Sequence, residues 1–416
     1  MMTTLHQDAL PDGAPHLRRT LSLPWLVFYG VGVTVGAGIF ALIGEVLRLA
    51  GDHAPLAFLL AGLIAAVTGV SYALLVRVFP RAGGEAVFVN RGLGRVWGRV
   101  AGFGMVATGT ISSAVVALAF AGYMRALVAV PEELLVGAVI LSLAGVAWLG
   151  VRESVVLAAL VTVLEVGALV VVIGFGVPLL GDLPSVALSF VPAGDAVLLA
   201  GVLSGAVLAF FAFIGFEDIV NMAEETVRPA RTVPRAILWT IAITVTLYAL
   251  LAAIAAQAPN RAEIAGSAAP LAVLFEAVSG RAGEGIAGVA ALAMINGILV
   301  QIVMASRVLY GMANEGLAPA WFGAVGAWRR TPTRATVTVA ACVLTLALLV
   351  PLVRLAEWSS LVTLGVFALV NLALVALGRS LDDPLVRRFR WWGALGAALC
   401  LGIAGFQILS AVIAPG

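Results

Sequence analysis

The chain has 416 residues, of which 62% are hydrophobic and only 11% are charged. Soluble globular proteins carry about 25% charged residues, so this composition excludes a soluble protein and indicates one that lies in a lipid bilayer. The formal net charge of +2 gives no reason to expect a nucleic-acid partner.

The apolar segments decide what kind of membrane protein this is. Backbone polar groups must be paired inside a bilayer, which leaves helical bundles and closed barrels as the possible folds. The segments continue for about 20 residues without the alternation of barrel strands, so they predict an all-α membrane protein. Residues 1–22 are polar and show no cleavable signal pattern, so we expect a cytoplasmic tail followed by a retained first helix.

We expect about eleven transmembrane helices. In chain order they are predicted near 24–47, 54–76, 101–124, 132–150, 154–178, 197–219, 234–257, 285–311, 333–353, 358–378 and 391–413. Residues 80–100 are too charged to span the bilayer and are expected to lie along its inner face.

The placement of arginine predicts the orientation. With the N-terminus in the cytoplasm, nineteen arginines fall on the inner side and only five, Arg48, Arg125, Arg261, Arg281 and Arg354, on the outer side. Cytoplasmic loops are enriched in basic residues, so we expect a multi-pass protein of the inner (cytoplasmic) membrane with a cytoplasmic N-terminus.

The order of the helices predicts two repeats of five. The first repeat would occupy 23–180, the second 196–380, and an additional helix 390–416. A repeat with an odd number of helices must insert its second copy upside down. Each repeat begins with a helix that is interrupted near its middle, at 35–40 and at 211–218, and such pairs point to the binding site of a transporter.

The first interruption contains Gly36, Ala37 and Gly38. Glycine lets a helix unwind, and the N–H groups that are freed there favour a carboxylate. The same glycines could instead serve close helix packing, because Gly32 and Gly36 form a small-xxx-small pair. A dinucleotide-binding fingerprint is excluded, since a charge-free segment of membrane-spanning length passes straight through these residues.

The second interruption combines aromatic residues with a glycine and two acids. Phe210, Phe211, Phe213 and Phe216 surround Gly215, and the acidic pair 217–218 follows. Unwound carbonyls there could accept hydrogen bonds from an ammonium group. Alternatively, the phenylalanines face lipid and the acids mark the cytoplasmic end of an ordinary helix.

Five motifs in this order resemble one family. They are G-A-G-I-F at 36–40, P-R-A-G-G-E at 80–85, F-F-A-F-I-G-F-E at 210–217, A-E-E-T-V-R-P-A-R-T-V-P-R at 223–235 and A-S-R-V-L-Y-G-M-A-N-E-G-L-A-P at 305–319. Together they are similar to the amino acid-polyamine-organocation (APC) superfamily of permeases. The resemblance covers the first ten helices and implies a LeuT-type 5+5 inverted-repeat bundle, here with one additional C-terminal helix.

The resemblance also implies the binding residues of an amino acid substrate. Amides of the first interruption would hold its carboxylate, and carbonyls of the second would hold its amine. The amides are those of Gly36, Ala37, Gly38 and Ile39, and the carbonyls those of Phe210, Phe211, Ala212 and Ile214. Phe213 would be an aromatic gate, and Thr110 and Ser113 are candidate side-chain contacts.

Glu165 is a candidate for ion coupling. It stands alone among apolar residues near the middle of its helix, where a carboxylate costs at least about 2.5 kcal/mol. Relatives of the family often have a lysine there, in the pattern T-x-x-K, whereas this chain retains Thr162 and replaces the lysine by Glu165. The carboxyl group could carry a proton, attract a cation together with Asn296, or stay protonated and bond a neighbour.

The sequence therefore predicts a secondary active transporter that moves an amino acid by alternating access, coupled to protons. Remaining alternatives are an exchanger of amino acids and polyamines, a cationic amine transporter, and an ion channel in which Glu165 is a permeation site. An enzyme is not expected, because the chain has no HExxH motif, no nucleophile elbow and no Cys/His cluster. We accordingly expect no metal and no cofactor.

Overall fold

The computed structural model describes residues 19–80, 83–149, 155–181, 190, 192, 195–326 and 331–413. Helices form nearly all of these residues, and the described part contains no strand beyond one isolated bridge between Leu21 and Thr226. The fold class expected from the sequence, an all-α membrane protein, is confirmed. The cytoplasmic tail predicted for 1–22 lies almost entirely outside the described residues.

Each expected span corresponds to one long helix. These helices are α1 (Leu23–Ala50), α2 (Ala54–Val78), α4 (Arg95–Arg125), α5 (Glu132–Leu149), α6 (Val155–Gly176), α8 (Ala196–Phe211), α9 (Pro229–Gln257), α12 (Glu284–Asn314), α13 (Thr333–Leu349), α14 (Leu352–Ser380) and α15 (Pro384–Ile413). Within the described ranges, nine apolar segments are long enough to cross a membrane; the first joins α1 and α2, and α13 adds a helix of 17 residues. The protein is therefore a multi-pass membrane protein.

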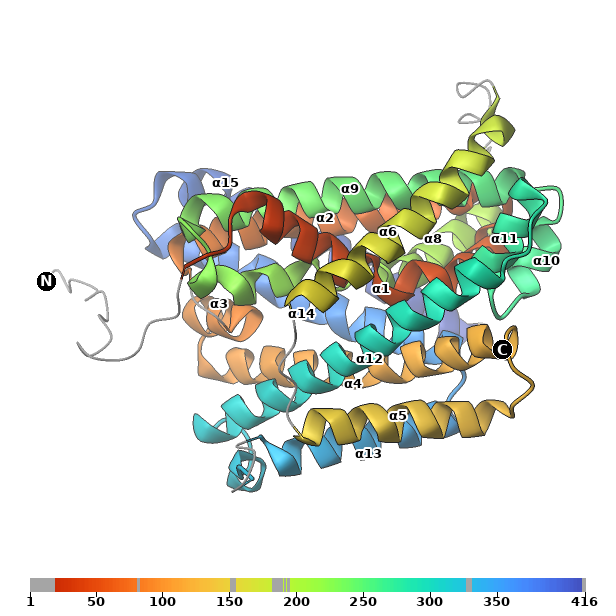
Figure 1. The fold of residues 1–416 in the computed structure, drawn as a ribbon. Helices are drawn as coiled ribbons and strands as arrows, with labels where there is room; N and C mark the ends of the chain where they lie inside the picture. Colours follow the sequence, from red (N-terminus) through yellow and green to blue (C-terminus); the bar gives the residue numbers. More distant parts are fainter. Residues whose placement is uncertain are drawn as a thin grey trace, which may run out of the picture.

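Short elements close the two ends of the bundle. They are η1 (Gly51–His53), α3 (Gly84–Leu93), η2 (Val177–Leu180), η3 (Phe216–Glu225), α10 (Arg261–Gly266), α11 (Pro270–Ser279) and η4 (Ala320–Gly323). Figure 1 shows α3 at one end of the long helices and α10 with α11 at the other. Helix α3 buries Glu85 and Phe88 against the bundle and exposes Asn90 and Arg91, whereas residues 95–100 of the segment predicted to lie on the inner face already belong to α4.

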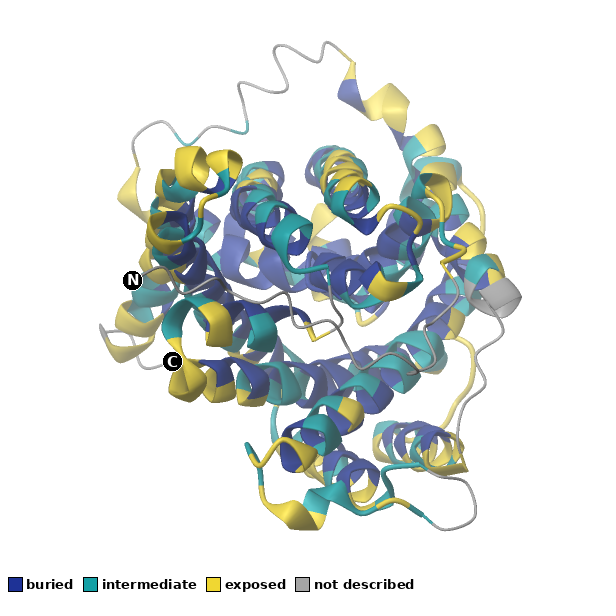
Figure 2. Cartoon of the chain, turned by 90° about the vertical axis from the view of Figure 1, so that its left-hand side faces the viewer, coloured by how far each residue is buried: buried dark blue, intermediate teal, exposed yellow. Residues whose placement is uncertain are grey.

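Apolar side chains occupy both the interior and the periphery. In Figure 2, which looks along the helices, buried residues fill the centre and exposed ones form the rim. Large apolar side chains such as Leu134, Leu141 and Val412 are more than half exposed on that rim. An apolar rim suits a bundle surrounded by lipid rather than water.

Buried polar side chains tie the second half of the chain to the first. The Asn371 amide accepts a hydrogen bond from Ser71 at 2.6 Å and donates one to Thr68 at 3.0 Å, which fixes α14 against α2. Ser112 and Ser359 share a hydrogen bond of 2.8 Å between α4 and α14. These bonds satisfy polar groups that lipid could not, and they hold α2, α4 and α14 around the two broken helices.

Candidate substrate-binding site

Helix α1 is interrupted at Gly36. The backbone of Gly36 has φ −9° and ψ −152°, outside helical values, and the helix resumes immediately afterwards. The first N–H groups after such a break lack an acceptor within the helix, which applies to the amides around Ala37, Gly38 and Ile39. A Cβ added at Gly36 would meet no atom within 4 Å, so space lies directly beside the break.

The counterpart of this break follows α8. The helix ends at Phe211, and turns over 212–215 lead into η3. The carbonyls of Phe210 and Phe211 accept the N–H groups of Phe213 and Ile214, at 3.0 and 3.2 Å, and the Phe211 carbonyl retains a second lone pair.

Gly215 permits the reversal of direction at the end of this turn. Its φ of 127° lies in a region that favours glycine. A Cβ there would also lie 2.9 Å from the carbonyl oxygen of Val33. No other residue type fits this crossing of η3 over α1 without distortion.

The two breaks touch each other. A Cβ added at Gly38 would lie only 2.6 Å from the Cα of Ala212, so the two backbones are in direct contact. The hydroxyl of Tyr248 on α9 lies 2.9 Å from the carbonyl oxygen of Thr34 and 3.0 Å from that of Ala212. One side chain therefore bridges the two interrupted helices, and nothing in its sequence context distinguished it.

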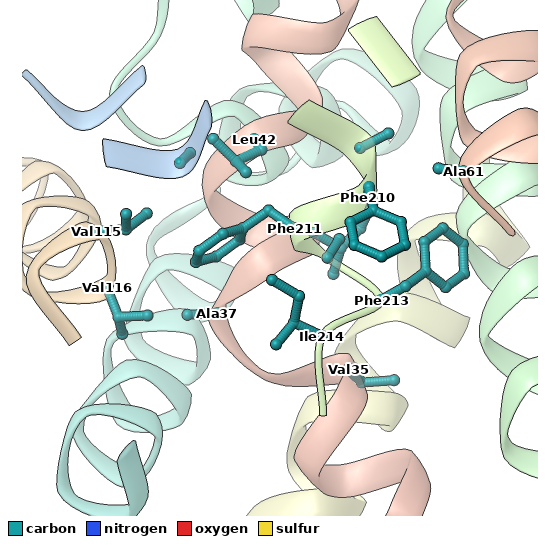
Figure 3. Close-up of a cluster of buried hydrophobic side chains, with 14 of the residues drawn as sticks. Val35, Ala37, Leu42, Ala61, Val115, Val116, Phe210, Phe211, Phe213 and Ile214 are labelled. Carbon is teal, nitrogen blue, oxygen red and sulfur yellow. The ribbon is translucent and has the colours of Figure 1, made fainter. Parts of the chain in front are cut away.

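The phenylalanines around the second break are buried. Phe210, Phe211, Phe213 and Phe216 are at most 5% exposed, so the alternative in which they face lipid is wrong. Figure 3 shows Phe211 directed toward the α4 side, where Val115 and Val116 lie, and Phe213 on the opposite side.

Phe213, the expected gate, packs edge-on against Tyr248, with their ring centroids 5.0 Å apart. Its ring also approaches Gly62 of α2. Phe213 is therefore directed toward α2 and α9, and the aromatic ring that faces α4 is that of Phe211.

A small cavity lies next to the second break. Ile214, at the end of the turn, lines it together with Met105, Thr108, Gly109, Glu217, Asp218 and Gln301. Its volume is about 30 Å³, enough for one or two water molecules and too small for an amino acid. The acids that line it are 2% and 8% exposed, so they do not mark the end of an ordinary helix.

Buried acidic residues extend from this cavity to α3. Glu217 accepts a hydrogen bond of 2.8 Å from the Gly215 N–H, and Tyr72 donates one of 3.0 Å to Glu85. Burial raises the pKa of Glu85 to about 7, helped by the nearby charge of Asp218, although hydrogen bonds from its own backbone and from Tyr72 act in the opposite direction. The sequence motif P-R-A-G-G-E contained Glu85, but its role as a buried neighbour of the break was not predicted.

The two hydroxyl groups expected on α4 are buried and bonded within their own helix. Thr110 donates to the carbonyl of Val106 and Ser113 to that of Gly109, both at 2.7 Å. Each oxygen still has lone pairs to accept a further bond. Ser113 lies on the same face of α4 as Gly109, four residues away, and Thr110 is offset from that face.

Glu165 is buried beside the first break. It is 1% exposed, and its Oε2 atom has no hydrogen-bond partner among the described residues. A Cβ at Gly32 would meet the hydroxyl of Thr162 on α6, so α6 touches α1 one turn before Gly36, and Glu165 is one turn beyond Thr162. Tyr248 is near this carboxyl group, and its hydroxyl has the Thr34 and Ala212 carbonyls as its partners.

Asn296, the other expected coupling residue, is half-buried on α12. Its neighbour Gly297 faces Val116 of α4. No contact between Asn296 and Glu165 is seen in the described part of the chain, and their pairing stays a prediction.

The end of the bundle opposite α3 is covered by α10 and α11. The Tyr123 hydroxyl donates to the carbonyl of Phe40 at 2.8 Å and accepts the N–H of Leu271 at 3.2 Å. A Cβ at Gly44 would lie 2.8 Å from the carbonyl oxygen of Ile264. These contacts hold α10 and α11 against the C-terminal half of α1, between two predicted spans, where the sequence predicted no helix.

Two broken helices that meet at the centre of a membrane bundle, between a covered end and a small cavity, define a membrane transporter. A sequence model of the family described as "Amino acid permease" matches residues 20–415. The chain belongs to this amino acid permease family.

Individual relatives agree with this assignment. An uncharacterized transporter of Mycobacterium tuberculosis is 33% identical, over 93% of this chain and 86% of that protein. The branched-chain amino acid permease BcaP of Bacillus subtilis is 28% identical, over 92% of this chain and 85% of that protein. A mitochondrial cationic amino acid transporter of Arabidopsis thaliana is 28% identical, over 86% of this chain and 62% of that protein. The family and these names point to a transporter rather than an enzyme, with amino acids as the substrates.

Proposed function

We propose that this protein moves an amino acid across the cytoplasmic membrane by alternating access, coupled to protons. The observation that carries the proposal is the contact between Gly38 and Ala212, since it brings freed amides of α1 next to carbonyls of the turn after α8. Donors at one break suit the substrate carboxylate, and acceptors at the other suit its ammonium group. The binding residues are those expected from the sequence, with Phe211 and Phe213 on opposite sides of the break.

Tyr248 links the two broken helices, which suits a mechanism in which both move together. It is bonded to the Thr34 and Ala212 carbonyls, so rearrangement at one broken helix is transmitted to the other. The outer end is covered by α10 and α11, while the small cavity lies on the side of η3 and Asp218. In the proposed cycle the two ends of the protein open in turn, one while the other is closed, and the binding site between the inverted repeats 23–180 and 196–380 stays in place.

Glu165 is the proposed proton carrier. A buried carboxyl oxygen without a partner is costly when charged, so proton binding is favoured there. Tyr248, whose hydroxyl lies within hydrogen-bond distance of a carbonyl at each break, is near this carboxyl group. The alternative is a cationic amine transporter or an exchanger, in which Glu165 attracts a cation. The Arabidopsis relative that is named a cationic amino acid transporter is the reason to include cationic substrates in the uptake experiment.

The proposed orientation places the N-terminus in the cytoplasm, from the excess of arginine on that side. The end that carries α3 is then cytoplasmic, and α10 with α11 is external.

Uptake by protein reconstituted in liposomes tests the proposal. An inward proton gradient should stimulate accumulation of a labelled amino acid, and Glu165→Gln should remove the stimulation while preserving substrate binding. Glu133→Gln, at an exposed position on α5, is the matched control. Uptake by Glu165→Gln with the same gradient dependence as the unmodified protein would exclude the proton role. Ohmic currents without saturable uptake would instead favour a channel.

A further inference from the structure

One face of α4 leads from the inner cavity to the two breaks. Met105 and Gly109 of this face line the cavity, and Val116 follows Gly109 by seven residues, about two turns further along the helix. A Cβ added at Gly297 of α12 would lie 3.7 Å from a methyl group of Val116, so Val116 points into the gap between α4 and α12. This valine therefore lies on the cavity side of α4, at the height of the second break.

The space beside the break in α1 is bordered by apolar side chains. Ala37, Val116, Phe211 and Ile214 keep 4–9% exposure at the centre of the protein, whereas the adjacent Val115 is completely buried. Figure 3 shows Val116, Ala37, Phe211 and Ile214 grouped around the same space. The substrate atoms that extend from the proposed carboxylate and amine positions toward α4 would meet these groups first.

Neither Val116 nor Phe211 lines the cavity that contains the acids. Ile214 lines it together with Glu217 and Asp218, and the Glu217 carboxylate accepts a hydrogen bond from the Gly215 N–H. Glu165 belongs to α6 and lies near Tyr248. An ammonium or guanidinium group placed between Val116 and Phe211 would lose its hydration without gaining a counter-charge, which is strongly unfavourable.

We infer that the substrate is a neutral amino acid with an aliphatic side chain, and that Val116, Phe211 and Ile214 select it. This inference rests on the proposed function, because it takes the carboxylate and the amine to be held at the two breaks. It names a substrate class that the family does not decide, since its members include proteins named for branched-chain and for cationic amino acids.

Competition for binding tests the substrate class. The purified protein is heated with glycine, alanine, valine, leucine, isoleucine, phenylalanine, lysine or arginine, and the best stabiliser is then used as the labelled substrate in liposomes. We expect valine, leucine or isoleucine to compete with the label, and lysine and arginine to leave uptake unchanged at tenfold higher concentration. Lysine or arginine competing as well as leucine would overturn this inference and leave the transport proposal intact. Stabilisation by no amino acid, together with no uptake, would overturn the transport proposal itself.

A pair of neighbouring valines tests the selecting surface. Val116→Ala enlarges the proposed subsite and should shift the preference from valine toward leucine and phenylalanine by about tenfold, as expected for a change of one or two methyl groups. Val115→Ala removes the same atoms from a fully buried position and should leave the order of substrates unchanged. If Val116→Ala does not fold, Val116→Thr keeps the shape and should weaken valine binding several-fold through its hydroxyl. Equal effects at both positions, or none at Val116, would contradict the assignment.

Discussion

Gly38 of α1 and Ala212 after α8 are in backbone contact, at a separation that leaves no room for a side chain on the glycine. The contact explains why a helix that already contains Gly30, Gly32 and Gly36 tolerates a further glycine, at about 1 kcal/mol relative to alanine. The glycines of α1 therefore differ in their surroundings: Gly32 packs against α6, Gly38 packs against the second break, and no atom lies within 4 Å of a Cβ placed on Gly36.

Substitution of Gly38 by alanine should separate the two breaks. The added methyl group would meet backbone rather than a flexible side chain, so we expect a loss of about 1–3 kcal/mol of stability and a large loss of substrate binding. Gly167→Ala on α6 is the control, since a Cβ there meets no atom within 4 Å. Thermal unfolding and ligand-induced stabilisation measure both effects. Wild-type binding by Gly38→Ala would show that the contact is not required at the site.

Removal of the Tyr248 hydroxyl should uncouple the broken helices. Tyr248→Phe keeps the ring contact with Phe213 and leaves the Thr34 and Ala212 carbonyls without this donor, at a cost of about 1–3 kcal/mol. We expect weakened uptake and weaker stimulation by a proton gradient.

Tyr123→Phe provides a comparison for this variant. It removes one donated and one accepted hydrogen bond at the end of the bundle covered by α10 and α11, one turn of α1 beyond Gly36, and should lower stability while leaving the proton stimulation unchanged. If both variants lose the stimulation equally, a specific link through Tyr248 is contradicted.

The buried amide of Asn371 should contribute to stability independently of transport chemistry. Asn371→Ala leaves Ser71 without its acceptor, removes the amide donor to Thr68 and opens a cavity between α2 and α14, so we expect a loss of about 2–4 kcal/mol. Asn314→Ala, at an exposed position, should change stability by less than about 0.5 kcal/mol. Thermal unfolding in the same detergent compares the two variants; equal stability would show that the amide bonds are replaceable.

The helices could be predicted from the sequence because lipid imposes their length and their apolar composition. The break at Gly36 and the turn after Phe211 were also predictable, from glycines inside a span and from acids placed beside aromatic residues. In each case the residues that predict the feature lie within a few positions of it in the sequence.

Contacts between distant segments were not predictable in this way. Tyr248 looks like any aromatic residue of an apolar helix, and only the packing of α9 against α1 brings its hydroxyl to Thr34. The short helices α10 and α11 were missed because they contain 6 and 10 residues, too few for a spanning pattern. Glu85 appeared to belong to a charged surface segment, and its burial depends on Tyr72, thirteen residues earlier on another helix.

Glu85 should make the stability of the protein depend on pH. Its pKa is raised from 4.5 to about 7 by burial and by the nearby Asp218, so the folded protein holds a proton there that the unfolded chain releases. Below about pH 4.5 the group is protonated in both states and costs nothing. As the pH rises from 4.5 to 7 the unfolded chain ionises first, and stability falls by an amount on the order of 2–3 kcal/mol.

Glu85→Gln removes this dependence and keeps an oxygen that can accept the Tyr72 hydroxyl. Its melting temperature should match that of the unmodified protein near pH 4.5 and exceed it by a few degrees at pH 8, where the unmodified protein must bury a carboxylate beside Asp218. Glu133→Gln, at an exposed position, should show no such pH-dependent gain. A melting temperature of Glu85→Gln that runs parallel to the unmodified protein from pH 4.5 to 8 would mean that Glu85 is solvated or paired with a cation in solution, and that the acidic group beside the cavity is less closed than its contacts indicate.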